Sequence, residues 1–459
     1  GNLARGARCV LLFPDAHTFI LPDPTDTSAL LDTYATDTPE ATPRLVHPWE
    51  AVLVTSNGTI RSQTLILLVA TLVVYSAQGL LVPVLAPVTR LVGLREVDLG
   101  AVMTLAAAML VFTAGWWGRE VDRIGVHAVL VRGLVLATVG TVGFALMTEL
   151  ASRQDLPRWI VVGVFVLTRG VIYGLGMAAV PVAALTYFAS VTEGTEARTK
   201  AMGAFGAMQG ISLVVGPALG GAFAMITLLM PIYIAPALMV ATLFAVLSLR
   251  SPEHQQREET VQLAWGDKRV LPYLIVGGFL FLGLALVEII MGFLVQDRLG
   301  LSDEDTAVTV ATAGVLIGLG FAATQGLLAP RVPGGPRALM ALGSLCAAAG
   351  YGFAMAVSSL PLLLAAMLAV AVGLGLALPG YNAGATLAVD PSEHAGVAGR
   401  LAATVGLTYM VGPVLGAGLY SMNPFAPLIG AGLLSLIAAG LAAGKLQSSS
   451  AAGRNPDGA

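Results

Sequence analysis

The sequence predicts an all-α membrane protein in which twelve transmembrane helices form two pseudo-symmetric six-helix bundles. The first reason is composition: 56% of the 459 residues are apolar and only 11% are charged, whereas soluble domains carry about 25% charged residues. The second is a series of apolar runs, each long enough to cross a bilayer, which takes about 20 residues. The third is an internal repeat with a period of 196 residues, from Gly216 to Gly412. A long-period duplication in a membrane chain is typical of a transporter built from two similar halves.

The repeat centres on the segment Gly210–Gly221, GISLVVGPALGG. A shift of 196 residues places Gly203, Ala207, Gly210, Val215, Gly216, Pro217, Leu219 and Gly220 on Gly399, Ala403, Gly406, Val411, Gly412, Pro413, Leu415 and Gly416. Gly216 and Gly220 lie four residues apart, on one face of a helix, so a neighbouring backbone can approach them closely in the membrane. Pro217 removes one intrahelical hydrogen bond, so we expect a bend there.

The order of polar and apolar segments predicts the domain organisation. Residues 1–61 are rich in Asp, Thr and Pro without sustained periodicity, so we expect a disordered or loosely ordered cytoplasmic segment. The first bundle is expected over 62–249, a cytoplasmic linker over 250–269, the second bundle over 270–445 and a disordered tail over 446–459. The predicted spans are 63–88, 99–117, 127–149, 159–187, 201–225, 231–249, 270–295, 306–329, 338–357, 361–387, 396–420 and 424–444.

The distribution of Lys and Arg among the short loops predicts the orientation. If the N-terminus is cytoplasmic, the inner loops hold Arg119, Arg123, Arg198, Lys200, Arg250, Arg257, Lys268, Arg269, Arg331 and Arg337. The outer loops then hold only Arg90, Arg95, Arg153, Arg158 and Arg298. We therefore expect both termini in the cytoplasm, and a monomeric integral protein of a bacterial plasma membrane.

Several classes of function are disfavoured by what the sequence lacks. The net charge of −3 gives no reason to expect a nucleic-acid partner. No phosphate-binding loop of the Walker type is present, and the five histidines show no metal-ligand spacing. The two cysteines cannot form a disulfide framework. We expect no enzyme activity, no cofactor and no metal; the expected partners are a small-molecule substrate, protons and the lipid bilayer.

The loop between the second and third predicted spans contains Gly118, Asp122, Arg123 and Gly125. A tight cytoplasmic turn is the simplest interpretation, but the pattern G-x-x-x-D-R-x-G at this place resembles the signature loop of the major facilitator superfamily. The resemblance implies a cytoplasmic gate, in which Asp122 and Arg123 make charge contacts between the two halves in one state and break them in the other. The equivalent segment 326–331 has no acidic residue, so such a gate would be asymmetric.

The fourth and fifth spans carry two further resemblances to this superfamily. Arg169, about 15 Å below the outer boundary, is followed by Gly174 and Gly176, like the superfamily's fourth-helix motif of an Arg and a Gly-x-Gly run. The first Gly lies five residues after the Arg instead of four, which would rotate the two by about 100° in an α-helix. The run Gly216–Gly221, GPALGG, resembles the fifth helix of the proton-coupled drug antiporter branch, where it implies the contact between the halves and a block to proton leak.

Glu288 is the only acidic residue well inside a span of the second half. At about 12 Å below the outer end, its removal from water favours the neutral form, which would let it exchange protons near neutral pH. Glu288 and Arg169 are therefore the candidates for proton coupling. A Glu facing a wet vestibule, and an Arg bonded to a backbone carbonyl, are the structural alternatives.

Uncharged polar side chains within the spans are the candidates for a substrate cavity. Facing inward, they would supply a few hydrogen-bonding groups among apolar walls. The candidates are Tyr75, Gln78, Tyr173, Gln209, Gln325, Tyr381, Asn382 and Tyr409. Each of them singly could equally join two helices by a hydrogen bond.

These features together predict a secondary active transporter that exchanges protons for a small amphipathic or lipophilic compound by alternating access, as in multidrug efflux. An uptake symporter or facilitator for a small metabolite is the first alternative; a sugar or organic-anion site would need more buried polar and charged groups than these spans offer. A non-transporting membrane scaffold or sensor is the second alternative, and the retention of Asp122, Arg169 and Glu288 argues against it.

Overall fold

The computed structural model describes residues 10–12, 18–20, 58–191, 195–249, 264–356, 359–390 and 393–445. Gly1–Ala51 forms a unit of its own, in which strand β1 (Val10–Leu12) pairs antiparallel with β2 (Thr18–Ile20). The rest of the predicted N-terminal segment up to residue 57, most of the predicted linker and the predicted tail lie outside the described residues.

Twelve helices in the described part of the chain are long and apolar enough to span a membrane, which confirms the predicted fold class. In the first half they are built from α3 (Gly58–Leu91), α4 (Glu96–Ile124), α5 (Val126–Arg153), α6 (Arg158–Phe165), the π-helix η2 (Val166–Ile172), α7 (Tyr173–Val191), α8 (Thr195–Ala224) and α9 (Met230–Leu247). In the second half they are built from α10 (Leu271–Glu288), α12 (Asp303–Ala323), the π-helix η3 (Thr324–Leu328), the 3-10 helix η4 (Ala329–Arg331), α13 (Gly335–Ala356), α14 (Leu360–Leu387), α15 (His394–Met422) and α16 (Ala426–Lys445). A short helix, α11 (Met291–Leu299), follows α10.

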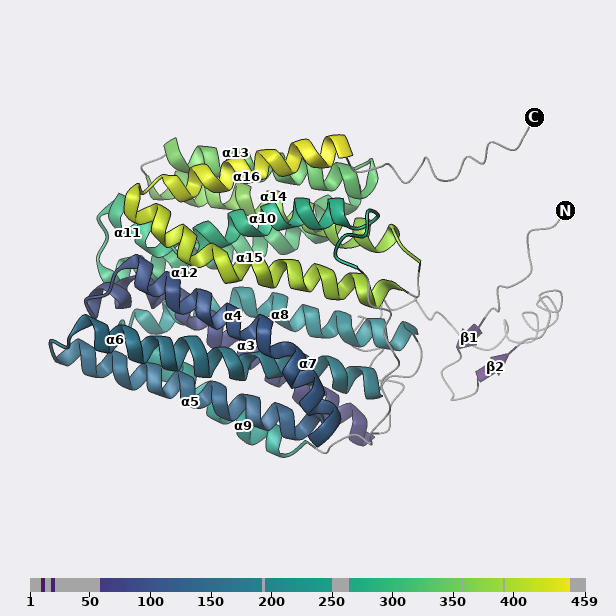
Figure 1. The fold of residues 1–459 in the computed structure, drawn as a ribbon, viewed down its shortest axis with the longest axis horizontal. Helices are drawn as coiled ribbons and strands as arrows, with labels where there is room; N and C mark the ends of the chain where they lie inside the picture. The colour runs from purple at the N-terminus through teal and green to yellow at the C-terminus, as the bar shows by residue number, and fades with distance from the viewer. Residues whose placement is uncertain are drawn as a thin grey trace, which may run out of the picture. The chain divides into compact units, whose positions relative to one another are not determined.

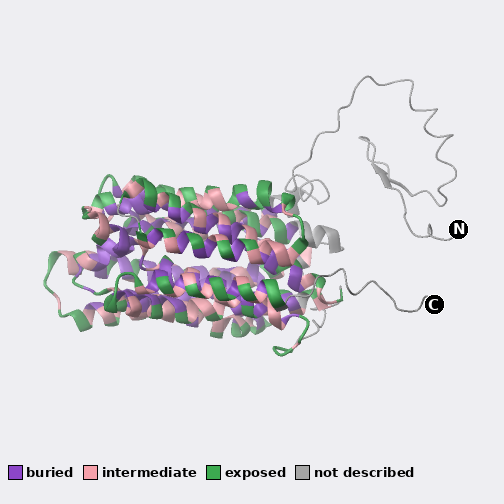
Figure 2. Cartoon of the chain, turned by 90° about the horizontal axis from the view of Figure 1, so that it is seen from above, coloured by how far each residue is buried: buried purple, intermediate pink, exposed green. Residues whose placement is uncertain are grey.

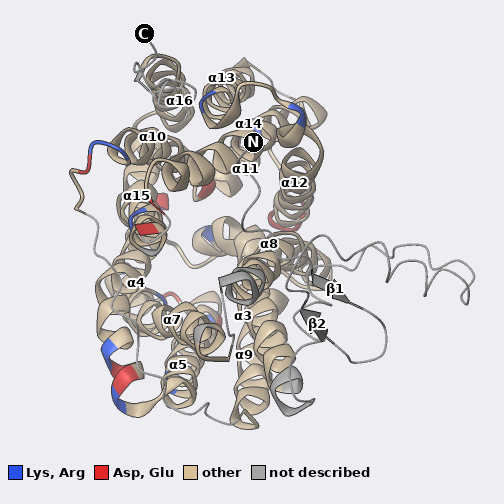
Figure 3. Cartoon of the chain, turned by 90° about the vertical axis from the view of Figure 1, so that its right-hand side faces the viewer, with Lys and Arg blue, Asp and Glu red and all other residues tan. Residues whose placement is uncertain are grey.

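The helices form two bundles that lie side by side (Figure 1). In the first, α3 packs on α8 and α9, and α5 packs on α7 and α9; in the second, α13 packs on α14 and α16, and α10 packs on α15 and α16. Figure 3, which looks along the helices, shows α4 next to α15 on one side of the boundary and α8 next to α12 on the other. The two halves therefore meet through these two pairs of helices, which occupy equivalent places, and α3 also contacts α11 and α12 of the second half.

Apolar side chains cover the outside of the bundles as well as filling them. Fully buried residues include Leu80, Phe188 and Tyr351, whereas Phe112, Leu146 and Phe244 each expose about two-thirds of their surface. Figure 2 shows exposed residues along the whole length of the outer helices. Such a surface is unfavourable in water and suits lipid, where helices can satisfy all their backbone hydrogen bonds internally.

Candidate functional site

The GPALGG run lies in α8, where its glycines and its proline face different neighbours. A Cβ atom built on Gly216 would lie 2.8 Å from the Gly79 Cα of α3, and one on Gly220 would overlap the Leu80 carbonyl. The predicted close approach of a neighbouring backbone is thus confirmed, and that neighbour is the first helix of the same half. The Pro217 ring lies between the two halves: a Cβ atom on Gly79 of α3 would lie 3.3 Å from its Cδ, and one on Gly314 of α12 in the other half would lie 2.9 Å from its Cβ.

The repeated run in α15 uses the same division of faces. A Cβ atom on Gly412 would overlap Ala285 of α10, and one on Gly416 would overlap the next carbonyl of that helix. Pro413 faces the first half, since a Cβ atom on Gly100 of α4 would lie 2.7 Å from the Pro413 carbonyl oxygen. In both copies, therefore, the glycine pair holds the motif helix to its own bundle and the proline lies on the contact with the other bundle.

The two copies differ in the residue that follows the second motif glycine, Gly220 or Gly416. In α8 it is Gly221, which leaves room for the Ala311 side chain of α12; in α15 it is Ala417, which projects toward Gly100 of α4. Each interface thus pairs one glycine with one alanine and keeps the same short spacing. The α4–α15 interface adds a hydrogen bond between halves, in which the Val414 N–H donates to Thr104 Oγ1 at 3.1 Å.

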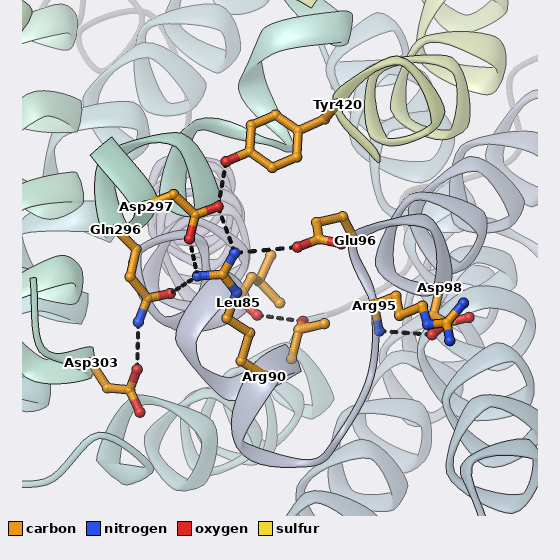
Figure 4. Close-up of polar contacts among 10 residues, drawn as sticks. Leu85, Arg90, Arg95, Glu96, Asp98, Gln296, Asp297, Asp303 and Tyr420 are labelled. Carbon is orange, nitrogen blue, oxygen red and sulfur yellow. Dashed lines mark hydrogen bonds and ion pairs between the residues drawn. The ribbon is translucent and has the colours of Figure 1, made fainter. Parts of the chain in front are cut away.

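Polar groups join the two halves at the end of the bundles where α3 stops (Figure 4). Arg90 of α3 donates two hydrogen bonds to the Asp297 carboxylate of α11, at 2.6 and 2.8 Å. It also donates to Gln296 Oε1 at 2.9 Å and to Glu96 Oε1 of α4 at 3.2 Å. The Tyr420 hydroxyl of α15 donates to Asp297 Oδ2 at 2.6 Å. One arginine of the first half is therefore held by acids of both halves in a fork geometry.

Aromatic and amide groups complete this polar cluster. The Arg90 guanidinium lies 5.2 Å from the centroid of the Phe293 ring, and Gln296 donates a further hydrogen bond to Asp303 Oδ1 at 2.6 Å. Partial burial acts to raise the pKa of Asp297, but the hydrogen bonds from Arg90 and Tyr420 and the Arg90 charge outweigh it. The pKa of Asp297 is therefore lowered, and the ion pair persists throughout the neutral range.

Sequence reasoning did not single out this cluster. Arg90 entered the prediction only as a basic residue of an outer loop, and Asp297 and Tyr420 did not enter it at all. The available signal was weak, because each residue by itself resembles an ordinary polar group at the end of a span. Arg90 and Asp297 are 207 positions apart in the sequence, and they come into contact only when the two bundles pack.

At the opposite end, the predicted loop from Gly118 to Gly125 is helical up to Ile124, which corrects its expected loop conformation. No proline interrupts α4, and the helix continues through Gly118. Gly125, at φ 85°, joins α4 to α5 in a conformation that other residues rarely adopt. Asp122 is exposed in the last turn of α4. Arg123 forms an ion pair with Glu120 of its own helix at 3.3 Å, so this contact lies within the first half.

Glycines in the four helices of the boundary show how the two ends differ. Near the Arg90 end, Gly100 and Gly314 are in close contact with the other half. Toward the opposite end, a Cβ atom would meet nothing within 4 Å on Gly115 of α4, Gly206 of α8 or Gly326 after α12. Gly210 of α8, in the antiporter-like segment, is equally open. The described contacts between halves are thus concentrated in the Arg90 end and the middle of the bundle.

Arg169 lies in the π-helix η2. This position changes the interpretation of the five-residue spacing between Arg169 and Gly174. In a π-helix the backbone hydrogen bond joins residues five apart, whereas in an α-helix it joins residues four apart. Two residues five apart in a π-helix therefore lie on the same face, as two residues four apart do in an α-helix. The extra residue between Arg169 and Gly174 is therefore absorbed, and the expected rotation of about 100° does not follow. Gly174 packs on Ala106 of α4, and Gly176 packs on α5.

Four of the predicted site residues gather in the first half. The Arg169 side chain is 3% exposed, and its guanidinium carbon lies 3.8 Å from the centroid of the Tyr173 ring. The Tyr75 hydroxyl of α3 interacts with Gln209 of α8 and is near Tyr173. These side chains come from the fourth span, α3 and α8; α3 and α8 approach each other closely at Gly79 and Gly216, and the fourth span packs on α4 and α5 through Gly174 and Gly176.

Glu288 and Tyr409 are brought together in the second half. The Tyr409 hydroxyl of α15 donates a hydrogen bond to Glu288 Oε2 at 2.7 Å. Glu288 is the last residue of α10 and is exposed, which agrees with the alternative of an acid facing a wet vestibule. No Lys or Arg pairs with it among the described residues. The hydroxyl of Tyr351, nearby in α13, is buried without a hydrogen-bond partner. An acid held by a neutral donor, and not by a cation, can accept a proton without breaking an ion pair.

The remaining cavity candidates are placed differently. Gln78, Gln325 and Asn382 are exposed. Tyr381 is 2% exposed, packs on Gly277 and donates a hydrogen bond to the Leu401 carbonyl at 3.2 Å. The structure therefore places Tyr381 in the packing of α14 against α10 and α15, and not on the wall of a cavity.

Two helical bundles joined by a pseudo-symmetric boundary, with charged groups inside the spans, define a membrane transporter. Comparison with known families identifies the group: residues 67–348 match the model of the Major Facilitator Superfamily, and the chain belongs to this family. It is an integral membrane protein that transports small molecules, and not an enzyme.

Among curated proteins the chain is similar to bacterial drug-resistance proteins. It is 24% identical to Multidrug resistance protein 2 of Bacillus subtilis over 82% of this chain and 93% of the relative. It is 25% identical to the class B Tetracycline resistance protein of Escherichia coli over 79% of this chain and 89% of the relative. These relatives support the resemblance to the drug antiporter branch.

Solved structures share the fold at low sequence identity. A bacterial homolog of the human lysosomal transporter Spinster, in an inward-facing and occupied conformation, superposes with a TM-score of 0.65 at 14% identity, covering 84% of this chain and 97% of that structure. The human organic anion transporter MFSD10 superposes with a TM-score of 0.58 at 19% identity, covering 84% and 100%.

Proposed function

We propose that the protein is a proton-coupled efflux transporter for small amphipathic or lipophilic compounds, working by alternating access. The observation that carries the proposal is the Glu288–Tyr409 contact, in which an exposed acid in the last turn of a membrane-spanning helix has no basic partner among the described residues. An ionisable residue inside the membrane costs about 3 kcal/mol and is retained where it serves a function. The bacterial drug-resistance relatives favour efflux over uptake.

The contacts between halves indicate the conformation. If the excess of Lys and Arg marks the cytoplasmic side, Arg90 and Asp297 lie on the outer side and close it. The glycines of the inner side, such as Gly115 and Gly206, have open space around them. The structure then corresponds to an inward-facing state, from which Glu288 would release its proton to the cytoplasm. In the opposite state, Asp122 and Arg123 would contact the second half and close the inner side.

Transport in proteoliposomes tests proton coupling. Tetracycline and a quinolone are suitable first compounds, because the relatives are named for resistance to them. We expect Glu288→Gln to abolish transport driven by a pH gradient, because an amide carries no exchangeable acidic proton, while exchange of labelled for unlabelled compound continues without a gradient. Glu304→Gln is the matched control, since Glu304 is exposed at the start of α12. Transport by Glu288→Gln at the wild-type rate under a pH gradient would remove Glu288 from the coupling mechanism.

A further inference from the structure

Arg169 is a buried cation without an anionic partner. No Asp or Glu pairs with it among the described residues, and its Nε has no hydrogen-bond partner. Its contact is with the face of the Tyr173 ring, which lies 3.8 Å away. A ring face compensates a desolvated guanidinium only in part. The site therefore lacks the negative charge that would balance it.

The groups around Arg169 are hydrogen-bond donors and not acids. The Tyr173 hydroxyl is buried, and apart from the adjacent Arg169 it has no hydrogen-bond partner. Tyr75 and Gln209, both half-buried, extend the polar surface from Tyr173 toward α8. A guanidinium presents its N–H groups in a planar fork that matches a carboxylate, and a phenol hydroxyl can add one more donor. These groups form a ready site for an anion.

The position of Arg169 is held by unusual backbone geometry. It lies in the π-helix Val166–Ile172, and such π segments are rare and occur frequently at functional sites. On the other side of this segment, a Cβ atom on Gly140 of α5 would lie 2.6 Å from the Thr168 carbonyl oxygen. Close packing against α5 fixes the π segment, so the guanidinium is oriented before any ligand arrives.

We propose that Arg169 and Tyr173 bind the anionic group of the transported compound, so that the substrates include amphipathic organic anions such as lipophilic carboxylates. This inference rests on the proposed transport function and names its substrate class. It also changes the expectation from the sequence that organic anions lack a site here. One cation that nothing neutralises attracts an anion more strongly than several cations paired with acids, because the ligand need not displace a protein carboxylate.

Equilibrium binding to the full chain in nanodiscs tests this site. The probes are pyrene-1-butyrate and its primary amide, which differ in charge but hardly in size, with empty nanodiscs to subtract partition into lipid. We expect the wild type to bind the carboxylate about tenfold more tightly than the amide, which corresponds to about 1.4 kcal/mol. Arg169→Gln should bind both probes equally, and Arg169→Lys should retain part of the preference, since a Lys offers the charge without the fork.

Two further variants keep the test decisive. Tyr173→Phe retains the ring under Arg169 and removes only the unpaired hydroxyl, so it should weaken carboxylate binding about threefold and leave the amide unchanged. Arg153→Gln, an exposed arginine at the end of α5, should behave as the wild type. Equal affinity of the wild type for both probes, or an undiminished preference in Arg169→Gln, would overturn the inference. The assay uses no proton gradient, so failure of Glu288 coupling would leave its result intact.

Discussion

The two ends of the bundle use similar side chains for different purposes. At the Arg90 end, an arginine of the first half is bonded to Asp297 of the second, and Tyr420 adds a third helix to the contact. At the opposite end, Arg123 pairs with Glu120 inside the first half, and Arg269 pairs with Glu393 inside the second at 2.8 Å. Ion pairs between the halves must break when the bundles rock, whereas ion pairs within a half can move with it.

Small residues show the same difference without any charge. Gly100 of α4 is pressed against the Pro413 carbonyl and Ala417 of α15, whereas Gly115, fifteen residues further along the same helix, has no neighbour within 4 Å. One helix therefore makes a tight contact between halves near one end and leaves space near the other. Packing along the helices between the halves (α4, α8, α12 and α15) therefore holds the Arg90 end closed, together with the polar cluster.

The largest effect is expected from Gly100→Val. A Cβ atom there would lie 2.7 Å from the Pro413 carbonyl oxygen and 2.8 Å from the Ala417 side chain, so the backbones must separate. Overpacking of this kind costs about 1–3 kcal/mol, and transport should fall by at least tenfold. Gly115→Val is the matched control on the same helix: a Cβ atom there meets nothing within 4 Å, so the distance between spin labels on the two halves should stay as in the wild type in this state, whereas Gly100→Val should lengthen it. Equal lengthening in both variants would show that the two ends do not differ in packing.

A smaller effect is expected when the polar cluster is cut by Arg90→Ala. Partly exposed ion pairs contribute about 1 kcal/mol, so the equilibrium should shift about fivefold toward the state in which this end is open. Spin labels on exposed positions 153 and 423, one in each half, would report the shift as a longer distance between them. Arg158→Ala is the control, because Arg158 pairs with Asp98 of its own half at 2.8 Å. A wild-type distance distribution in Arg90→Ala would show that the cluster does not hold the halves together.

The smallest effect is expected from a change of pH on the same label distance. The pKa of Asp297 lies below its ordinary value of 3.8, because the hydrogen bonds from Arg90 and Tyr420 outweigh its partial burial. A carboxyl with a depressed pKa contributes its stabilisation at neutral pH and loses it only as the pH falls through the depressed value. The distance should therefore stay constant from about pH 8 to about pH 5 and lengthen only in stronger acid. In Asp297→Asn it should be long at every pH; lengthening of the wild type near pH 6 would contradict this assignment.

Sequence reasoning succeeded where a local pattern carries the physics. The density of apolar residues predicted the spans, and the repeated glycines and prolines predicted two related halves and close helix contacts. It was less successful where the backbone departs from regular geometry. Nothing local distinguishes the π-turn at Arg169 from an α-helix with one displaced glycine, and nothing marks the helical continuation of α4 through Asp122 to Ile124.

The sequence by itself predicted a membrane transporter of two six-helix halves, because hydropathy and repeated motifs follow from the order of the residues alone. Only the tertiary structure decided which charges have partners: Arg90 has Asp297, Glu288 has the neutral Tyr409, and Arg169 has the face of Tyr173. The first two pairings join residues of different helices. The third depends on the π-helix, which has one extra residue in its turn. The energy of a charge in a membrane depends on what lies within a few ångströms of it, and distance along the chain does not give that information.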